Sequence, residues 1–132
     1  MKEKAIRARE TLMKVVFQME ARGTSDEELL TAVLEEAGTD KEQEKYIKDN
    51  FRAISDNIGM IDAIIERHLV KWPITRIPKT DLAILRVAIG EVKYGSKTPA
   101  AIAINEAVEL AKAYCGEKSP AFINGLLGKA LS

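Results

Sequence analysis

Hydrophobic residues recur every three or four positions along almost the whole chain, which is the spacing of amphipathic helices. The first predicted helix covers residues 4–22 and ends at Gly23, because glycine commonly ends helices. No stretch shows sustained alternation of polar and apolar residues, so no β-strand is expected. The predicted fold class is therefore all-α, with about seven helices.

Residues 25–68 contain further helix signals. A hydroxyl residue followed three positions later by glutamate forms a capping box, and two such pairs occur, Ser25 with Glu28 and Thr39 with Glu42. Gly38 is expected to end the helix that the first pair begins. The helix that the second pair begins is expected to run toward His68, with a break near Gly59.

The segment "KWPITRIPKT" is the one clear linker, because it contains two prolines. We expect Trp72 to be held between these prolines and the preceding helix. Beyond the linker, a hydroxyl residue is expected to cap each of three helices, and these are Thr80, Thr98 and Ser119. The chain of 132 residues is thus predicted to form one domain, with sub-bundles at roughly 1–70 and 78–132 joined by 71–77.

Charge is segregated along a chain whose formal net charge is zero. Residues 1–22 carry six bases and three acids, and residues 67–132 carry ten bases and five acids. Residues 23–66 carry four bases and twelve acids. If the two ends of the chain meet, they form a basic surface opposite an acidic one, which suits local binding of nucleic acid.

Several classes of protein are disfavoured by composition. The longest stretch without charge is ten residues, 119–128, too short to span a bilayer. No signal-peptide pattern opens the chain, and the single Cys115 suits a reducing cytoplasm. One histidine, His68, and one cysteine do not make a usual zinc site, and no glycine-rich phosphate loop occurs. We therefore expect a cytoplasmic protein without membrane association, cofactor or catalytic activity.

The first helix carries more apolar surface than one side can bury. Its predicted core stripe consists of Ala5, Ala8, Leu12, Val15, Val16 and Met19. A second apolar patch lies outside that stripe, formed by Ile6, Met13 and Phe17 and flanked by Arg7, Arg9 and Lys14. An aromatic ring beside cations suits single-stranded RNA, whose bases stack and whose phosphates need neutralising. The alternative is that Phe17 simply packs against a second helix.

The second half of the chain carries the most specific motifs. These are Leu85–Arg86 through Glu91 in "TDLAILRVAIGEVKYG", Ile102–Lys112 in "TPAAIAINEAVELAKAY", and Phe122–Leu127 in "SPAFINGLLGKAL". Together they closely resemble the NusB family of bacterial transcription antitermination factors. The opening "RARETLMKVVFQ" is similar to the family's arginine-rich start.

This resemblance implies a fold of two three-helix sub-bundles and a protein without catalysis. It implies pairing with the ribosomal small-subunit protein NusE and binding of the boxA element in nascent ribosomal RNA. That complex would help other Nus factors load onto RNA polymerase, so that terminators are read through. Whether the free protein is a monomer or a homodimer is left open.

The resemblance and the local chemistry together give the expected RNA-binding residues: Lys2, Lys4, Arg7, Arg9, Lys14, Phe17, Lys118, Phe122 and Asn124. The cluster of bases at the start is thinner than in the family, and Phe17 replaces a family tyrosine. Lys118 stands where an acid is common. Phe122 and Asn124 begin a helix whose free N–H groups favour phosphate.

Three further residues are given other roles. Asp81, in a stretch that belongs to the family's partner surface and is expected to be exposed, is the candidate for contact with NusE. Arg86 is expected to be a structural residue paired with a carboxylate, for which Glu91, Glu106 and Glu109 are the candidates. Gly125 and Gly128 are expected to permit close approach of another helix or of RNA, and close helix packing is the favoured cause.

Two alternative functions remain. A protein-only helical adaptor would have lost useful RNA affinity together with the arginine cluster. A detached copy of the NusB-like domain of ribosomal RNA methyltransferases is the other, although no catalytic domain accompanies it here. Titration of boxA RNA with and without NusE distinguishes the first alternative from the preferred function.

Overall fold

A computed structural model describes residues 2–22 and 27–132. The described residues form seven α-helices and one short 3-10 helix, η1, and contain no strand. In chain order the elements are α1 Lys2–Arg22, α2 Glu27–Ala37, α3 Lys41–Asp56, α4 Ile58–Arg67, η1 Ile74–Arg76, α5 Lys79–Lys93, α6 Ala100–Tyr114 and α7 Ser119–Ala130. The all-helical prediction is confirmed. Gly23 and Ser25, in the first predicted stop and capping box, lie outside the described residues.

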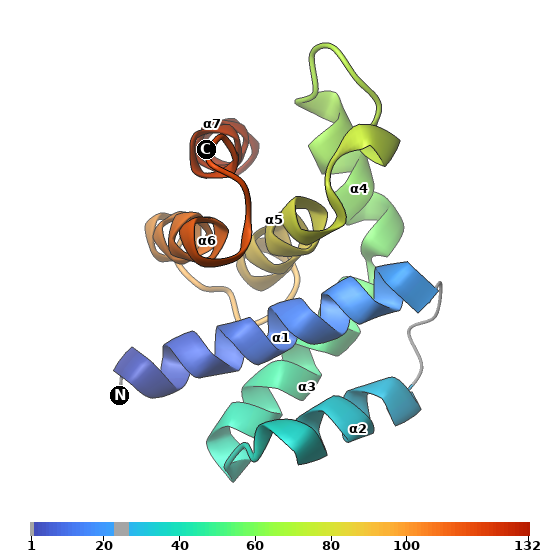
Figure 1. Cartoon of the computed structure of the whole chain (residues 1–132), viewed down its shortest axis with the longest axis vertical. Helices are drawn as coiled ribbons and strands as arrows, with labels where there is room; N and C mark the ends of the chain where they lie inside the picture. The colour runs from blue at the N-terminus through green and yellow to red at the C-terminus, as the bar shows by residue number, and fades with distance from the viewer. Residues whose placement is uncertain (1, 23–26) are drawn as a thin grey trace.

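Helix α5 lies at the centre of the molecule (Figure 1). It packs against α1, α3, α4, α6 and α7, while α1 also packs against α2 and α3. The buried apolar side chains of all seven helices form one continuous core. Because α5 contacts helices on both sides of the linker, it ties the two halves of the chain together. The division into sub-bundles at 71–77 stays a prediction.

The sequence of α5 explains its central place. All eleven residues from 81 to 91 are buried, whereas an ordinary surface helix buries one stripe. Gly90 faces α3, and a Cβ added there would overlap Cγ1 of Ile54. The absence of a side chain at this position lets α3 and α5 approach closely.

The helix boundaries correct several sequence predictions. The capping box of α3 is Asp40 with Gln43, one position after the predicted Thr39 and Glu42. The break between α3 and α4 falls at Asn57, two residues before Gly59. Gly38 ends α2 as predicted, and its φ of 63° is a conformation that glycine adopts without strain.

The predicted hydroxyl caps of the last three helices are wrong. Prolines occupy the N-cap positions of α5 and α6, so neither Thr80 nor Thr98 has that role. Lys118 is the N-cap of α7, and Ser119 is already helical. None of these three N-cap residues makes a side-chain hydrogen bond to its helix.

The segment between α4 and α5, residues 68–78, projects from the bundle in Figure 1. Trp72 lies in this segment and is 54% exposed, so the prediction that it is held against the preceding helix is wrong. Val70 is 88% exposed beside it. The burial of Ile77 at the end of the segment anchors it to the core. Among the helices described, none is both long and apolar enough to cross a membrane.

Candidate nucleic-acid interface

Two arginines of α1, Arg7 and Arg9, lie in different environments. Arg7 is exposed, and within the described part of the chain it forms no ion pair. The guanidinium of Arg9 donates from Nε and Nη2 to the two carboxylate oxygens of Glu91, each at 3.1 Å. The side chain of Arg9 is 12% exposed and that of Glu91 is 1% exposed. The prediction of Arg9 as a phosphate ligand is therefore corrected, because its guanidinium is already paired inside the protein.

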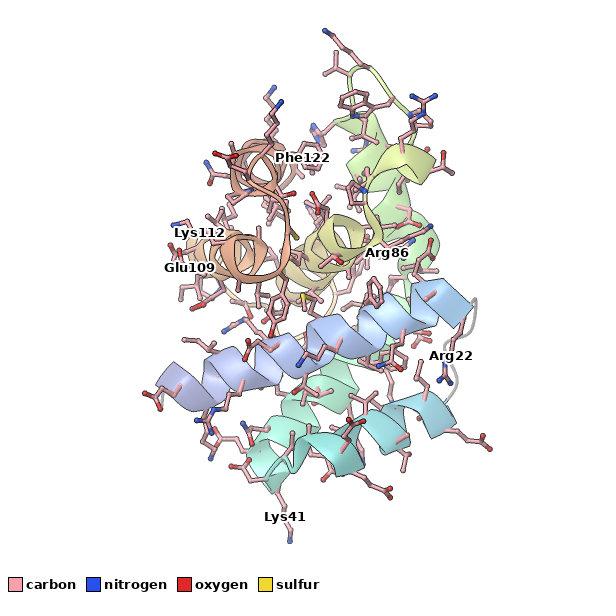
Figure 2. The ribbon with its side chains drawn as sticks, viewed as in Figure 1. Arg22, Lys41, Arg86, Glu109, Lys112 and Phe122 are labelled. Carbon is pink, nitrogen blue, oxygen red and sulfur yellow. The ribbon has the colours of Figure 1, made fainter. Side chains whose placement is uncertain are left out.

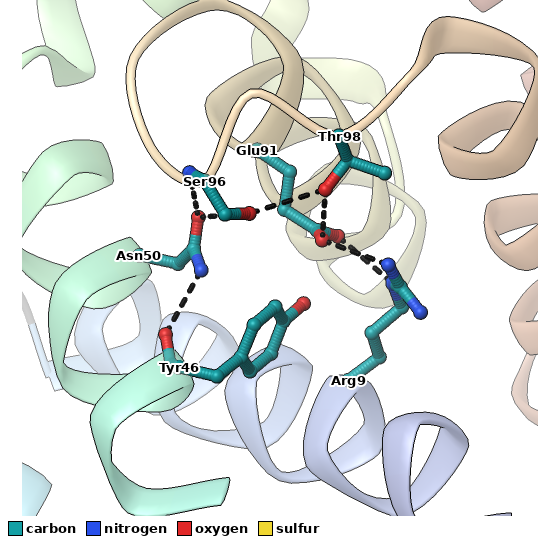
Figure 3. Close-up of polar contacts among 6 residues, drawn as sticks. All are labelled: Arg9, Tyr46, Asn50, Glu91, Ser96 and Thr98. Atoms are coloured by element: carbon teal, nitrogen blue, oxygen red, sulfur yellow. Dashed lines mark hydrogen bonds and ion pairs between the residues drawn. The ribbon is translucent and has the colours of Figure 1, made fainter. Parts of the chain in front are cut away.

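Arg9 and Glu91 belong to a polar network at the junction of α1, α3 and α5 (Figure 3). Thr98 Oγ1 donates to Glu91 at 3.0 Å. The buried Asn50 donates to the backbone oxygen of Tyr46 and accepts from the backbone N–H of Ser96. The network thus attaches the turn between α5 and α6 to helices α1 and α3.

Tyr46 packs directly against this network. The guanidinium of Arg9 lies 5.7 Å from the centre of its ring, within the range of a cation–π interaction. Burial raises the pKa of Tyr46, and the carboxylate of Glu91 raises it further. Tyr46 is therefore a neutral packing partner of Arg9.

The first turns of α1 offer fewer free cations than their sequence indicates. Lys4 pairs with Asp40 at 2.5 Å and with Glu42 at 3.5 Å. The hydrogen bond to Asp40 is the main cause of a raised pKa of Lys4. The side chain of Lys2 lies outside the described residues. Of the predicted cations on α1, Arg7 and Lys14 are exposed and remain free of ion pairs among the described residues.

Lys14 lies beside an aromatic residue, Tyr114, that the sequence analysis did not identify. Its Nζ lies 5.9 Å from the ring centre of Tyr114, the last residue of α6. The hydroxyl of Tyr114 donates to Glu10 at 2.8 Å, and the residue is 42% exposed. This hydrogen bond is the main cause of a raised pKa of Tyr114. The sequence signal was a tyrosine at a helix end, four residues before Lys118.

Of the remaining predicted RNA-binding residues, three lie at α7 and Phe17 lies on α1. Lys118 and Asn124 are exposed, whereas Phe122 is half-buried and packs against the core. Figure 2 shows Phe122 on the side of α7 that faces the end of α4. Phe17 on α1 is also half-buried against the core. Stacking on RNA therefore stays a prediction for both phenylalanines.

The two glycines of α7 do not have the packing role predicted from the sequence. Gly125 and Gly128 are exposed, and no atom outside the helix's own nearby backbone lies within 4 Å of a Cβ built on either. Close approach of another helix within this chain is thus not their cause. They leave bare backbone on the outer surface of α7.

Asp81 is buried, with 3% of the residue exposed, so the prediction of an exposed partner contact is wrong. It lies in the first turn of α5, where a carboxylate is favoured by the helix dipole. Burial, and then the carboxylate of Asp81, raise the pKa of the Cys115 thiol to about 12. Asp81 thus acts inside the protein, beside the turn between α6 and α7.

Arg86 is structural as predicted, but its partners are different. It donates to both carboxylate oxygens of Asp62, at 2.9 and 2.8 Å, and to Glu20 at 3.2 Å. These bonds connect α5 with α4 and α1. The predicted partner Glu106 instead lines a hollow between α1 and α6. The spacing of residues along α5 does not show which neighbouring helix Arg86 faces, and the structure shows that it faces α1 and α4.

Comparisons with known proteins agree with this architecture. The NusB family profile matches residues 6–132. A transcription antitermination protein NusB from Acetivibrio thermocellus is 44% identical over 124 residues, covering 94% of this chain and 86% of its own length. One from Clostridium perfringens is 36% identical over 126 residues, covering 94% and 93%.

Solved NusB structures also match this chain along almost its whole length. T. maritima NusB matches 95% of this chain and 88% of its own, with a TM-score of 0.83 and 36% identity. A NusB crystallised with NusE and double-stranded RNA matches 98% and 97%, with a TM-score of 0.88 and 29% identity. The chain belongs to the NusB family of transcription antitermination proteins.

Proposed function

We propose that this protein binds boxA-type RNA in nascent ribosomal RNA together with NusE, and that it acts in transcription antitermination. The observation that carries the proposal is the match along 98% of the chain to a NusB solved with NusE and RNA. The protein would act in the cytoplasm as a non-catalytic assembly factor that brings other Nus factors to RNA polymerase.

The exposed cations support the RNA-binding part of the proposal. Arg7 and Lys14 on α1 and Lys118 before α7 can each contact a phosphate without breaking an ion pair of the described structure. Phosphate contacts by such side chains supply most of the sequence-independent affinity for nucleic acid. Half-buried aromatic rings at Phe17 and Phe122 can add stacking with unpaired bases.

Because Asp81 is buried, we propose a different surface for contact with NusE. The projecting segment after α4 exposes Val70 and Trp72, which lie near Phe122 around a common hollow. Large exposed apolar side chains that lie together mark sites of protein contact, and tryptophan is frequent among residues that dominate binding energy. We assign NusE contact to this projecting segment.

The small number of free cations also supports a second candidate, the protein-only adaptor. Arg9 is paired with Glu91 and Lys4 with Asp40, which leaves fewer cations free for phosphate than the sequence predicts. A titration of labelled boxA RNA with the protein alone, and then with NusE present, separates the candidates. The proposed function predicts that NusE strengthens RNA binding, and Trp72→Ala abolishes that gain. RNA binding that is undetectable in both titrations, with NusE pairing intact, would favour the adaptor.

A further inference from the structure

We propose that Tyr114 is a stacking platform for one RNA base, at the point where the RNA crosses from α1 to the turn between α6 and α7. This inference rests on the proposed function and names an additional residue of the same site. Its basis is the position of the ring beside Lys14 and Glu10 on α1, in contacts that join α1 to the end of α6.

The ring of Tyr114 has the properties that stacking requires. The residue is 42% exposed, while the core side chains Leu110 and Ala111 hold the preceding turn of α6 in place. The hydrogen bond from its hydroxyl to Glu10 fixes the ring against α1. A base can therefore stack on a ring that is already oriented, and less conformational entropy is lost on binding.

Lys14 provides the charge at the same place. Its ammonium lies over the Tyr114 ring and, in the described structure, has no carboxylate partner. A lysine side chain is long and flexible, so it can leave the ring when a base takes its place and move to the adjoining phosphate. Stacking and neutralisation of one nucleotide thus come from Tyr114 and Lys14 together.

Acidic residues limit where the RNA backbone can pass. The hollow between α1 and α6 is lined by Glu10, Glu106 and Glu109, and its one arginine, Arg9, is paired with Glu91. Like charges repel a phosphate chain from Glu106 and Glu109, whereas Glu10 contacts Tyr114, over whose ring the cation Lys14 also lies. Tyr114 lies at the end of α6 and Lys118 four residues beyond it, so the favourable route crosses the molecule there.

Binding of fluorescently labelled single-stranded boxA RNA tests this inference, with the full chain and NusE present. Tyr114→Ala should weaken binding about tenfold or more, the loss of one base stack. Tyr114→Phe keeps the ring but not the bond to Glu10 and should bind within about threefold of wild type. Ile102→Ala is the matched control, because Ile102 is 49% exposed on the same helix. It should leave binding unchanged.

Tyr114→Leu, which keeps apolar bulk without a π system, should weaken binding as Tyr114→Ala does. Melting curves of each variant verify the fold, and the leucine variant serves if the alanine variant is unstable. Equal affinity of the leucine variant and wild type would overturn the platform while leaving the proposed function intact. Equal loss in the leucine and phenylalanine variants would show that the hydroxyl positions Glu10 and would overturn it too. Failure of the wild-type protein to bind RNA with NusE would overturn both.

Discussion

Helices α5 and α7 contrast in what they bury. α5 buries every residue from 81 to 91, including the charged Asp81, Arg86 and Glu91. α7 buries only Ile123, Leu126, Leu127 and Ala130 and leaves two glycines on its outer surface. The buried charges of α5 are paired within the protein or placed at its helix start, whereas Lys118 at the start of α7 is exposed and is in no ion pair of the described residues.

The contrast shows that charge by itself does not mark a binding residue in this chain. Arg9 and Arg7 are two positions apart on α1, and only Arg9 faces α5 and its buried Glu91. A guanidinium that is already paired inside the protein stabilises the fold and is not free for phosphate. The candidate interface therefore consists of exposed cations that form no ion pair among the described residues.

The largest effect is expected at the Arg9–Glu91 pair. Arg9→Leu should lower the free energy of unfolding by about 3–5 kcal/mol, because Glu91 is left as a buried charge without its guanidinium partner. Chemical denaturation followed by circular dichroism measures this loss.

The double variant Arg9→Leu with Glu91→Leu is the matched control. It removes both charges, so it should be more stable than Arg9→Leu alone. A double variant as unstable as the sum of the two single variants would show that the pair does not couple α1 to α5.

Glycine-to-alanine substitutions compare the two helices directly. Gly90→Ala should destabilise the protein by about 1–3 kcal/mol, because the new methyl group overlaps Ile54. Gly125→Ala meets no neighbour and should stabilise the protein by up to about 1 kcal/mol through helix propensity. Thermal melts of both variants measure the signs, and the same sign in both would refute the contrast between α5 and α7.

Much of the fold could be predicted because it depends on local patterns. The 3.6-residue period located the helices, and the motifs around Leu85, Ile104 and Phe122 indicated the family. Caps were misplaced by one or two residues, since an aspartate, a proline or a lysine near the predicted hydroxyl took the position. Such local competition is hard to resolve from sequence alone.

The site could be predicted less well, because pairing depends on distant residues. Arg9 and Glu91 are 82 positions apart, and Arg86 and Glu20 are 66 apart, so helical phase could not match them. Asp81 resembled a surface acid because nothing local shows that α5 is covered on all sides. Tyr114 was missed because its partners Glu10 and Lys14 come from the other end of the chain.

A smaller effect is expected from pH at the contact of α1 with α5. Partial burial raises the pKa of Glu20, but hydrogen bonds from Lys79 and Arg86 outweigh it, so the pKa lies below its ordinary value of 4.5. The stability that Glu20 contributes is therefore present above pH 4.5 and is lost as the pH falls through the lower folded-state pKa. In urea titrations, Glu20→Gln should make stability less dependent on pH below 4.5. An unchanged dependence would show that Glu20 is not held by these cations.

The most direct test of the account is the salt dependence of RNA binding for Arg7→Ala. Three or four phosphate contacts on single-stranded RNA predict a slope of roughly −2 to −3 in log affinity against log salt. Loss of the exposed Arg7 should flatten the slope by about 0.7 with little change in stability. The control is Arg22→Ala, an exposed arginine at the opposite end of α1 (Figure 2), which should leave the slope unchanged. Equal slopes for wild type and Arg7→Ala would contradict the assignment of the free α1 cations to RNA.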